Sequence, residues 1–261
     1  MTEAATRRTP GTPCWTSLMV HSLAATQDFY RALFDWEFTP GPQQLGAYVR
    51  AVRDGRPVAG LGELPAERQL PVSWLTYLAS NDADETAEMI RACGGTVAVG
   101  PLDADEAGRM LIAADPEGAV FGVWQEGEHT ALREAGLPGT PVWHELTARE
   151  PGAVAKFYQM VFGYEPDGMG STPAPEPGRR TLRLAGRPAC AIRSADPALP
   201  RDRGAHWMTH FAVADVDEAV RRVAELGGRV VEPPSDRATG RAALVTDREG
   251  AAFTVVRAAE V

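Results

Sequence analysis

Strand-like and helix-like patterns follow one another along the chain in a fixed order. Residues 15–20 and 142–148 have the pattern of short strands, and each is followed by a segment whose apolar residues have helical spacing. Those apolar residues are Leu23, Phe29, Tyr30, Leu33 and Phe34 in the first segment and Val154, Phe157, Tyr158, Val161 and Phe162 in the second. The spacing predicts two helices, which end near Asp35 and Gly163.

Further strands and a second helix are predicted after each of these helices. Around residues 48–52 and 58–61 we predict two strands, with a hairpin turn at Asp54-Gly55. The remaining predicted elements are strands over 74–79 and 207–213, helices over 83–92 and 216–226 that a Gly-Gly pair closes, and strands over 109–114 and 120–124. This order predicts four βαβββ units and an α+β fold.

An internal repeat divides the chain into two halves. The matched residues are Trp15 with Trp143, Phe29-Tyr30 with Phe157-Tyr158, Phe34 with Phe162, Trp36-Glu37 with Tyr164-Glu165, Gly55-Arg56-Pro57 with Gly186-Arg187-Pro188, Trp74 with Trp207, Gly94-Gly95 with Gly227-Gly228, Gly108-Arg109 with Gly240-Arg241, and Asp115 to Gly118 with Asp247 to Gly250. Such ordered matches indicate a duplication. We predict domains over 1–126 and 140–261 that fold independently, joined by a linker over 127–139.

Bulk properties limit the classes of function. A length of 261 residues fits two domains. No apolar run approaches the roughly 20 residues that cross a bilayer, and residues 1–14 do not resemble a signal peptide, so a soluble, cytoplasmic protein is expected. Cys14, Cys93 and Cys190 lack CxxC spacing and predict neither disulfides nor a thiolate metal site. The net charge of −9, without a basic cluster, argues against binding to nucleic acid.

In combination, several motifs resemble the vicinal oxygen chelate superfamily of glyoxalase I, extradiol dioxygenases and bleomycin-resistance proteins. These motifs are a helix that ends in Phe-Tyr, the following Phe-x-aromatic-Glu, the Gly-Arg-Pro strand entry, the Ala-Asp-x-Asp helix start, the Gly-Gly cap and the Asp-x-x-Gly turn. The resemblance covers residues 12–126 and 140–258 and is greatest to two-domain actinobacterial glyoxalase-like proteins. It implies two tandem domains, each of paired βαβββ units that form a cupped mixed sheet with helices on the convex face.

The resemblance also implies where metal ligands would lie. Enzymes of this superfamily hold a divalent ion with His, Glu or Asp side chains from the first and last strands of each unit. Alignment on Phe-Tyr places at those positions Trp15, Trp143, Leu75, Met208, Gly122 and Thr254. None of the six is a hard-metal ligand, and Glu63 is near a further position in the first domain only. We therefore predict that the protein holds no metal and no other cofactor.

Strand alternation predicts an aromatic lining for the two cups. The predicted ligand-binding residues are Trp15, Ser17, Tyr77, Trp124, Trp143, Glu145, Met208 and His210. Such a lining suits a flat, apolar or aromatic small molecule. The alternative is that some of these side chains fill the cup as a closed core. Trp74 and Trp207 alternate to the other face and are expected beneath the helices.

The titratable residues offer few catalytic combinations. His206 and His210 would lie on one strand face about 13 Å apart, too far to share an ion. His144 and Glu145 face opposite sides of a strand, and Glu145 is the one expected in the cup. Glu145 and His210 are therefore the candidate catalytic residues, as acid or base, unless they are solvated or ion-paired. The recurring Arg109 and Arg241 predict a structural contact, with the Asp of the following turn as the expected partner.

Three functions fit these observations. The first is a binding protein that sequesters or presents a small molecule such as an antibiotic or secondary metabolite, as bleomycin-resistance relatives do. The second is a metal-free enzyme that uses Glu145 or His210 on an aromatic or polyketide-like substrate. The third is a metal-dependent lyase or dioxygenase. The expected partner is a small organic molecule, without nucleic acid or membrane, and the chain is expected to be a monomer or homodimer.

Overall fold

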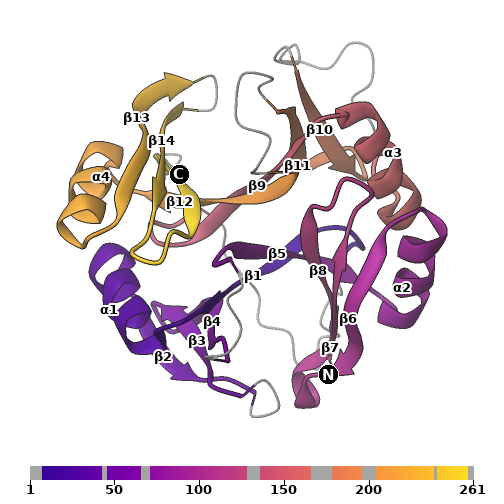
Figure 1. The fold of residues 1–261 in the computed structure, drawn as a ribbon, viewed down its shortest axis with the longest axis horizontal. Coiled ribbons are helices and arrows are strands. Elements are labelled where there is room, and N and C mark those ends of the chain that lie inside the picture. Colours follow the sequence, from indigo (N-terminus) through magenta and orange to yellow (C-terminus); the bar gives the residue numbers. More distant parts are fainter. Residues whose placement is uncertain are drawn as a thin grey trace, which may run out of the picture. The chain divides into compact units, whose positions relative to one another are not determined.

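The computed structural model describes residues 8–42, 46–65, 71–127, 136–165, 178–195, 204–237 and 240–257. Four modules follow in chain order (Figure 1). The first contains β1 (Pro13–Val20), α1 (Leu23–Phe34), β2 (Glu37–Pro40), β3 (Tyr48–Arg53) and β4 (Arg56–Glu63). The second contains β5 (Trp74–Ser80), α2 (Ala83–Ala92), β6 (Thr96–Asp103), a 3₁₀ turn (Asp105–Ala107), β7 (Gly108–Ala114) and β8 (Val120–Glu126).

The second half of the chain repeats this order with one difference. The third module contains β9 (Pro141–Ala148), α3 (Pro151–Phe162), β10 (Arg179–Leu184) and β11 (Arg187–Ser194). The fourth contains β12 (His206–Val213), α4 (Val216–Glu225), β13 (Arg229–Arg237), β14 (Gly240–Thr246) and β15 (Ala252–Arg257). Among the described residues, the third module has two strands after its helix. A single bridge between Glu165 and Arg183 lies where the other modules have an additional strand.

Each half of the chain forms one mixed sheet. The strand order is β2-β3-β4-β1-β5-β8-β7-β6 in the first sheet and β10-β11-β9-β12-β15-β14-β13 in the second. The first and last strands of every module pair in parallel, with register Ser17 to Gly60, Tyr77 to Gly122, Glu145 to Ala191 and His210 to Thr254. These sheets confirm the predicted α+β fold of two tandem domains. The domain boundaries at 126 and 140 remain predictions.

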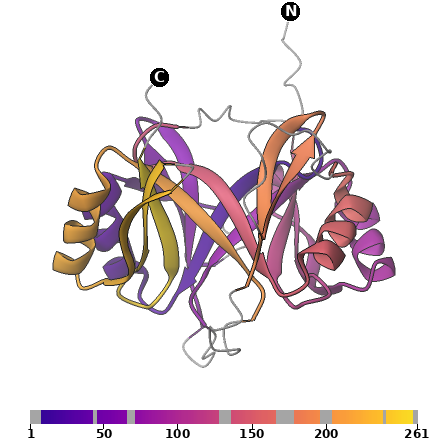
Figure 2. The same cartoon turned by 90° about the horizontal axis from the view of Figure 1, so that it is seen from above.

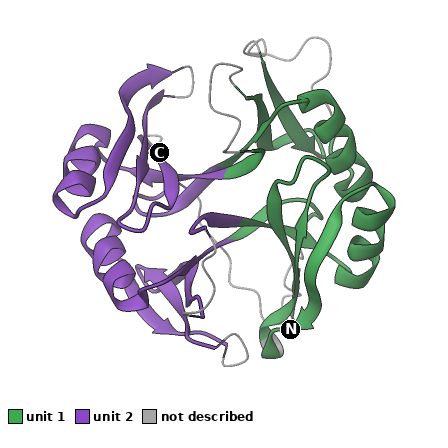
Figure 3. Ribbon diagram, viewed as in Figure 1, with its two compact units in different colours: residues 1–15, 76–130, 144–207 green, residues 16–75, 131–143, 208–261 purple. Residues whose placement is uncertain are grey.

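The chain packs into two compact units that do not follow its two halves (Figure 3). Unit 1 consists of residues 1–15, 76–130 and 144–207, and unit 2 of residues 16–75, 131–143 and 208–261. Unit 1 therefore combines the second and third modules, and unit 2 the first and fourth. In Figures 1 and 2 the two helices of each unit lie side by side, α2 with α3 and α1 with α4. None of the helices in the described part of the chain is long and apolar enough to cross a membrane.

A hydrophobic cluster fills each unit. In unit 2, Phe34 of the first half packs against Phe211 of the second, with ring centroids 5.1 Å apart. In unit 1, Phe121 of the first half packs against Phe157 of the second, with ring centroids 6.2 Å apart. The predicted core positions of Phe29, Phe34, Phe157 and Phe162 are confirmed, as are those of Trp74 and Trp207. The cores thus join residues from both halves, which argues against halves that fold independently.

A buried Trp–Tyr–Asp network recurs in the two units. In unit 2 the hydroxyl of Tyr30 donates to Asp247 Oδ2 at 3.1 Å and accepts a hydrogen bond from Trp74 Nε1 at 3.0 Å. The corresponding residues in unit 1 are Tyr158, Asp115 and Trp207, with distances of 3.2 and 3.0 Å. In each network the tyrosine and the aspartate come from different halves of the chain. The Phe-Tyr and Asp-x-Glu-Gly motifs are therefore two ends of one structural contact.

Burial raises the pKa of Asp115 and Asp247, although backbone N–H groups and the tyrosine hydroxyls favour the charged form. The folded state therefore binds these protons more tightly than the unfolded state does. The contribution of the two carboxyls to stability is complete at low pH and is lost as the pH rises through their folded pKa.

The glutamate of the same turn binds the start of a helix. Both carboxylate oxygens of Glu117 accept backbone N–H groups, those of Arg149 and Glu150 just before α3, at 2.7 Å each. Glu249 accepts those of His21 and Ser22 before α1 at 2.7 and 2.8 Å. A carboxylate at a helix N-terminus satisfies N–H groups that lack an intrahelical partner. The recurrence of this turn therefore has a structural explanation.

The contacts of Arg109 and Arg241 correct one prediction. Both arginines make the structural contact that their recurrence indicated, but the partner is not the aspartate of the following turn. Arg109 pairs with Asp84 at 3.0 Å, in the first turn of α2, and with Asp103 at 2.6 Å. Arg241 pairs in the same way with Asp217 and Asp236. Each arginine thus links a helix start to the strand hairpin that follows the helix.

Candidate functional site

One face of the first sheet within unit 1 consists of apolar side chains. Leu111, Ala113, Phe121 and Val123 belong to the hydrophobic cluster of the unit, so the residues that alternate with them face the other way. Two neighbouring rows cross this second face. They are Tyr77, Gly122, Ile112 and Val99 in the first row and Ala79, Trp124, Met110 and Leu102 in the second. We call the six large side chains, Tyr77, Val99, Leu102, Met110, Ile112 and Trp124, the apolar face.

The apolar face is partly open to solvent. Val99 and Leu102 are 44% and 49% exposed, whereas Tyr77 and Met110 are buried. The ring of Tyr77 lies directly over Gly122, where any side-chain carbon would overlap it. The glycine thus lets an aromatic ring lie flat against the sheet. A contiguous apolar surface with exposed members commonly marks a binding site.

The sequence identified Tyr77 and Trp124 as lining residues, and the structure brings both into this one face. It missed Val99 and Leu102, because no strand was predicted over the residues of β6. Met110 and Ile112 lie on the predicted strand over 109–114, but they were not identified as lining residues. Val97 and Val99 alternate after the Gly-Gly cap, but Gly100-Pro101 interrupts the pattern where the register of β6 shifts. The alternation before that dipeptide was the available signal.

The other predicted lining residues lie on β1, β9 and β12. Trp15, Trp143, Met208 and His210 are partly exposed, and Ser17 is buried. His210 follows the predicted alternation, since its neighbour Phe211 belongs to the core. In unit 2, the row that corresponds to Tyr77, Gly122, Ile112 and Val99 consists of His210, Thr254, Leu244 and Glu232. This face is more polar than its counterpart in unit 1.

Glu145 lies on β9, and the side chains of two arginines on neighbouring strands face its carboxylate. Its Oε1 is 2.6 Å from Arg179 Nε, and its Oε2 is 3.9 Å from Arg193 Nε. Both carboxylate oxygens thus face guanidinium groups, whereas a general base needs an oxygen directed at the substrate. His144 faces the other way, as predicted, and its Nδ1 lies 3.0 Å from Thr76 Oγ1. The arrangement favours a binding or structural role for Glu145 over proton transfer.

The residues at the strand positions that correspond to metal ligands do not fit a divalent ion. The register adds Gly60 and Ala191 as last-strand positions of the first and third modules. The other positions hold Trp15, Trp143, Leu75, Met208, Gly122 and Thr254, of which threonine alone offers an oxygen. Glu63 lies opposite Val20 at the end of β4 and is exposed. Within the described ranges, no three His, Cys, Asp or Glu side chains lie together as a metal site.

The donor chemistry leads to an expected metal content. We expect protein purified without added metal to contain well under one equivalent of Fe, Zn, Ni or Mn per chain, because neither glycine nor tryptophan binds these ions through its side chain. Elemental analysis of the full chain measures this. About one equivalent that survives treatment with a chelator would contradict the expectation.

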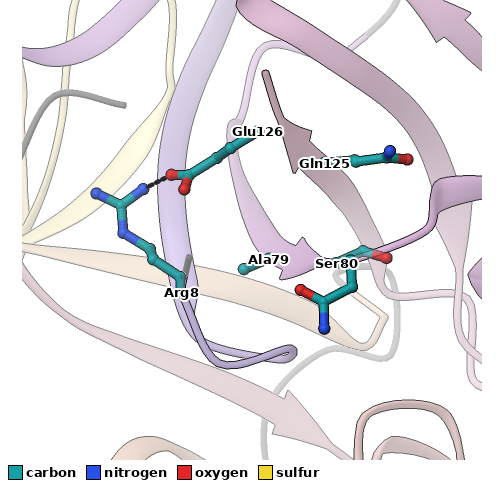
Figure 4. Close-up of a pocket in the computed structure, with 6 residues that line it drawn as sticks. Arg8, Ala79, Ser80, Gln125 and Glu126 are labelled. Carbon is teal, nitrogen blue, oxygen red and sulfur yellow. Dashed lines mark hydrogen bonds and ion pairs between the residues drawn. The ribbon is translucent and has the colours of Figure 1, made fainter. Parts of the chain in front are cut away.

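A small hollow also occurs in unit 1 (Figure 4). It is lined by Arg8, Ala79, Ser80, Asn81, Gln125 and Glu126. An ion pair between Arg8 and Glu126 lies beside it (Figure 4). The space accommodates about one water molecule, so it does not suit an organic ligand.

Comparisons with known proteins agree with this architecture. A family model described as a glyoxalase-like domain matches residues 143–256. The anthracycline biosynthesis protein DauV of Streptomyces sp. strain C5 is 34% identical over 282 residues, covering 98% of this chain and 96% of that protein. The Mn(II)-bound glyoxalase from Novosphingobium aromaticivorans has a TM-score of 0.63 at 17% identity, covering 95% and 82%. The 2,3-dioxygenase LapB from Pseudomonas sp. KL28 has a TM-score of 0.62 at 15% identity, covering 97% and 94%.

Proposed function

The chain belongs to the glyoxalase-like family of the vicinal oxygen chelate superfamily, and we propose that it binds a flat aromatic small molecule on the apolar face. In this role it sequesters or presents an antibiotic or another secondary metabolite, or it assists in the biosynthesis of one. Binding of this kind needs no metal, which agrees with the residues at the ligand positions of the fold.

The apolar face is the observation that carries the proposal. Trp124 offers a partly exposed ring beside the buried ring of Tyr77, while Val99 and Leu102 are apolar side chains that remain exposed. An aromatic ligand would cover this exposed surface, and each stacked pair would contribute about 0.5–1.5 kcal/mol beyond the burial of area. The two rows carry no charged side chain, so binding there leaves no buried charge without a partner.

The Streptomyces relative supports the chemical class of the ligand. It is named for anthracycline biosynthesis, and an anthracycline carries a planar, fused-ring aglycone. We propose a similar polycyclic aromatic compound for this chain. Of the lining predicted from the sequence, Tyr77 and Trp124 lie on the apolar face and belong to the proposed site. Ligand contacts from Trp15, Ser17, Trp143, Glu145, Met208 and His210 remain predictions from strand alternation and are not part of this site.

A fluorescence titration tests the proposal. An anthracyclinone, the neutral aglycone of an anthracycline, is expected to quench the tryptophan emission of the protein in a saturable manner. The variant Trp124→Ala is expected to bind it about tenfold more weakly, because one stacking surface and its burial are lost. Met89→Ala, on α2 and 41% exposed, is the control and should bind like the wild type. Equal affinities of Trp124→Ala and the wild type would contradict the proposed site.

A further inference from the structure

Glu145, Arg179 and Arg193 form a charged cluster on the second sheet within unit 1, which we call the arginine cluster. Arg179 lies on β10 directly opposite Arg193 on β11. Glu145 lies on β9 opposite Ala191, so Arg179 reaches the carboxylate across the small side chain of an alanine. The three charges thus come from three neighbouring strands and lie on one face.

The two arginines of the cluster differ in how closely they approach Glu145. Both guanidinium groups face its carboxylate, in a chain whose formal net charge is −9. Like charges directly opposite each other on neighbouring strands destabilise a sheet unless an anion lies between them. Arg179 has a close partner at 2.6 Å, but Arg193 is 3.9 Å from Glu145 and its side chain is 47% exposed. The guanidinium group of Arg193 is therefore accessible to a second anion.

The fold itself does not require these charges. The same register in the first sheet places Tyr48 opposite Gly62 where the second sheet has Arg179 and Arg193. Ser17, opposite Gly60, takes the place of Glu145. In the first sheet the side chain of Tyr48 covers both glycines. A Cβ added at Gly60 would overlap it, and a Cβ added at Gly62 would lie 3.1 Å from its ring. One copy of the repeat therefore forms these strands with an uncharged face. This argues against a purely structural role for the three charges in the other copy.

We propose that the arginine cluster is a second ligand site, which binds the carboxylate of a small organic acid. Arg193 pairs with the ligand carboxylate, while Glu145 holds the side chain of Arg179 beside the site. A planar guanidinium matches a carboxylate with two parallel hydrogen bonds, which favours arginine for this task. Thr147 and Thr181, opposite Arg193 and Ala191 in the register, lie on the same face.

This site is distinct from the apolar face. Leu146 and Ile192 of the second sheet and Leu111 and Val123 of the first belong to one hydrophobic cluster, so the outer face of each sheet points away from it. The two sites lie on different sheets. The second site therefore goes beyond the proposed function and is tested separately.

Calorimetry with 2-naphthoate and 2-naphthamide tests the second site. The two probes share shape and apolar area and differ in charge. Wild-type protein is expected to bind naphthoate more tightly than naphthamide. Arg193→Gln is expected to weaken the binding of naphthoate about tenfold or more, because a charge-assisted pair is lost. The affinity for naphthamide is expected to stay unchanged. Arg187→Gln removes the same charge from an exposed position six residues away on β11 and should bind like the wild type.

A second variant is expected to change the affinity for naphthoate in the opposite direction. Glu145→Gln removes the internal anion, so naphthoate is expected to bind several-fold more tightly. A purely structural ion pair would not produce this gain. Circular dichroism checks that each variant is folded. Equal affinity of the wild type for the two probes, absent binding of naphthoate, or unchanged naphthoate affinity in Arg193→Gln would overturn the proposal. The anthracyclinone titration is independent of these results because that ligand is neutral.

Discussion

Residues 1–130 and 138–261, expressed separately, are each expected to lack a cooperative thermal transition as monomers, and mixing them in equal amounts is expected to restore one. The sequence repeat suggests the opposite, that each half folds by itself. The cores change that expectation, because each of the two hydrophobic clusters contains residues from both halves.

The loss of burial in an isolated half is large. In the unit 2 cluster, Phe29, Tyr30 and Phe34 come from the first half, and Phe211 and Phe253 from the second. Burying one such side chain contributes about 1.5–3 kcal/mol, whereas a whole domain is stable by only about 5–15 kcal/mol. A half that leaves one side of both clusters exposed would lose an amount comparable to its total stability.

Calorimetry measures the thermal transition of each fragment, and sedimentation shows whether the fragment is a monomer. Sedimentation is needed because a half that pairs with a second copy of itself could cover the same surfaces. The full-length chain, which should melt in a cooperative transition, is the control. A cooperative transition in either fragment while it is monomeric would contradict the role assigned to the shared cores.

Tyr30→Phe and Tyr158→Phe are each expected to lower the free energy of unfolding by about 1–3 kcal/mol. Each change removes one hydroxyl and leaves a buried tryptophan N–H and a buried aspartate oxygen without their partner. The two networks share no residue, so the double variant is expected to show roughly the sum of the two effects.

Chemical denaturation at constant pH measures both changes. Tyr48→Phe removes a hydroxyl from a half-buried strand residue outside the networks and is the matched control, with a smaller expected effect. Midpoints for Tyr30→Phe and Tyr158→Phe that coincide with the wild type would show that the networks do not hold the halves together.

Local structure could be predicted well from the sequence. Helical spacing located α1 and α3, and the Gly-Gly pairs marked the ends of α2 and α4, where Gly94 and Gly227 adopt φ values of 86° and 84°. The composition of the two units could not be predicted in this way. A duplicated sequence contains equal apolar surfaces in both copies, so it does not specify which module covers which. The partners Tyr30 and Asp247 are 217 residues apart.

The candidate site could be predicted only in part, because it too depends on which strands lie next to each other. Alternation on a single strand places Tyr77 and Trp124 on the outer face, but Val99 and Leu102 join them through a register that two irregularities in β6 determine. Glu145 was identified as a candidate, while its partner Arg179 is 34 residues away and across an intervening strand. Periodicity describes one element at a time, and both sites depend on several.

A charge placed on the apolar face is expected to weaken the binding of an aromatic ligand there. Leu102→Asp introduces a carboxylate at a position that is 49% exposed, and Met160→Asp introduces the same group on α3 at a position that is 59% exposed. Both variants should remain folded, since neither residue is buried. Calorimetric titration with an anthracyclinone is expected to show affinity about tenfold or more weaker for Leu102→Asp and unchanged for Met160→Asp. Equal affinity of Leu102→Asp and the wild type would contradict binding of the ligand at the apolar face.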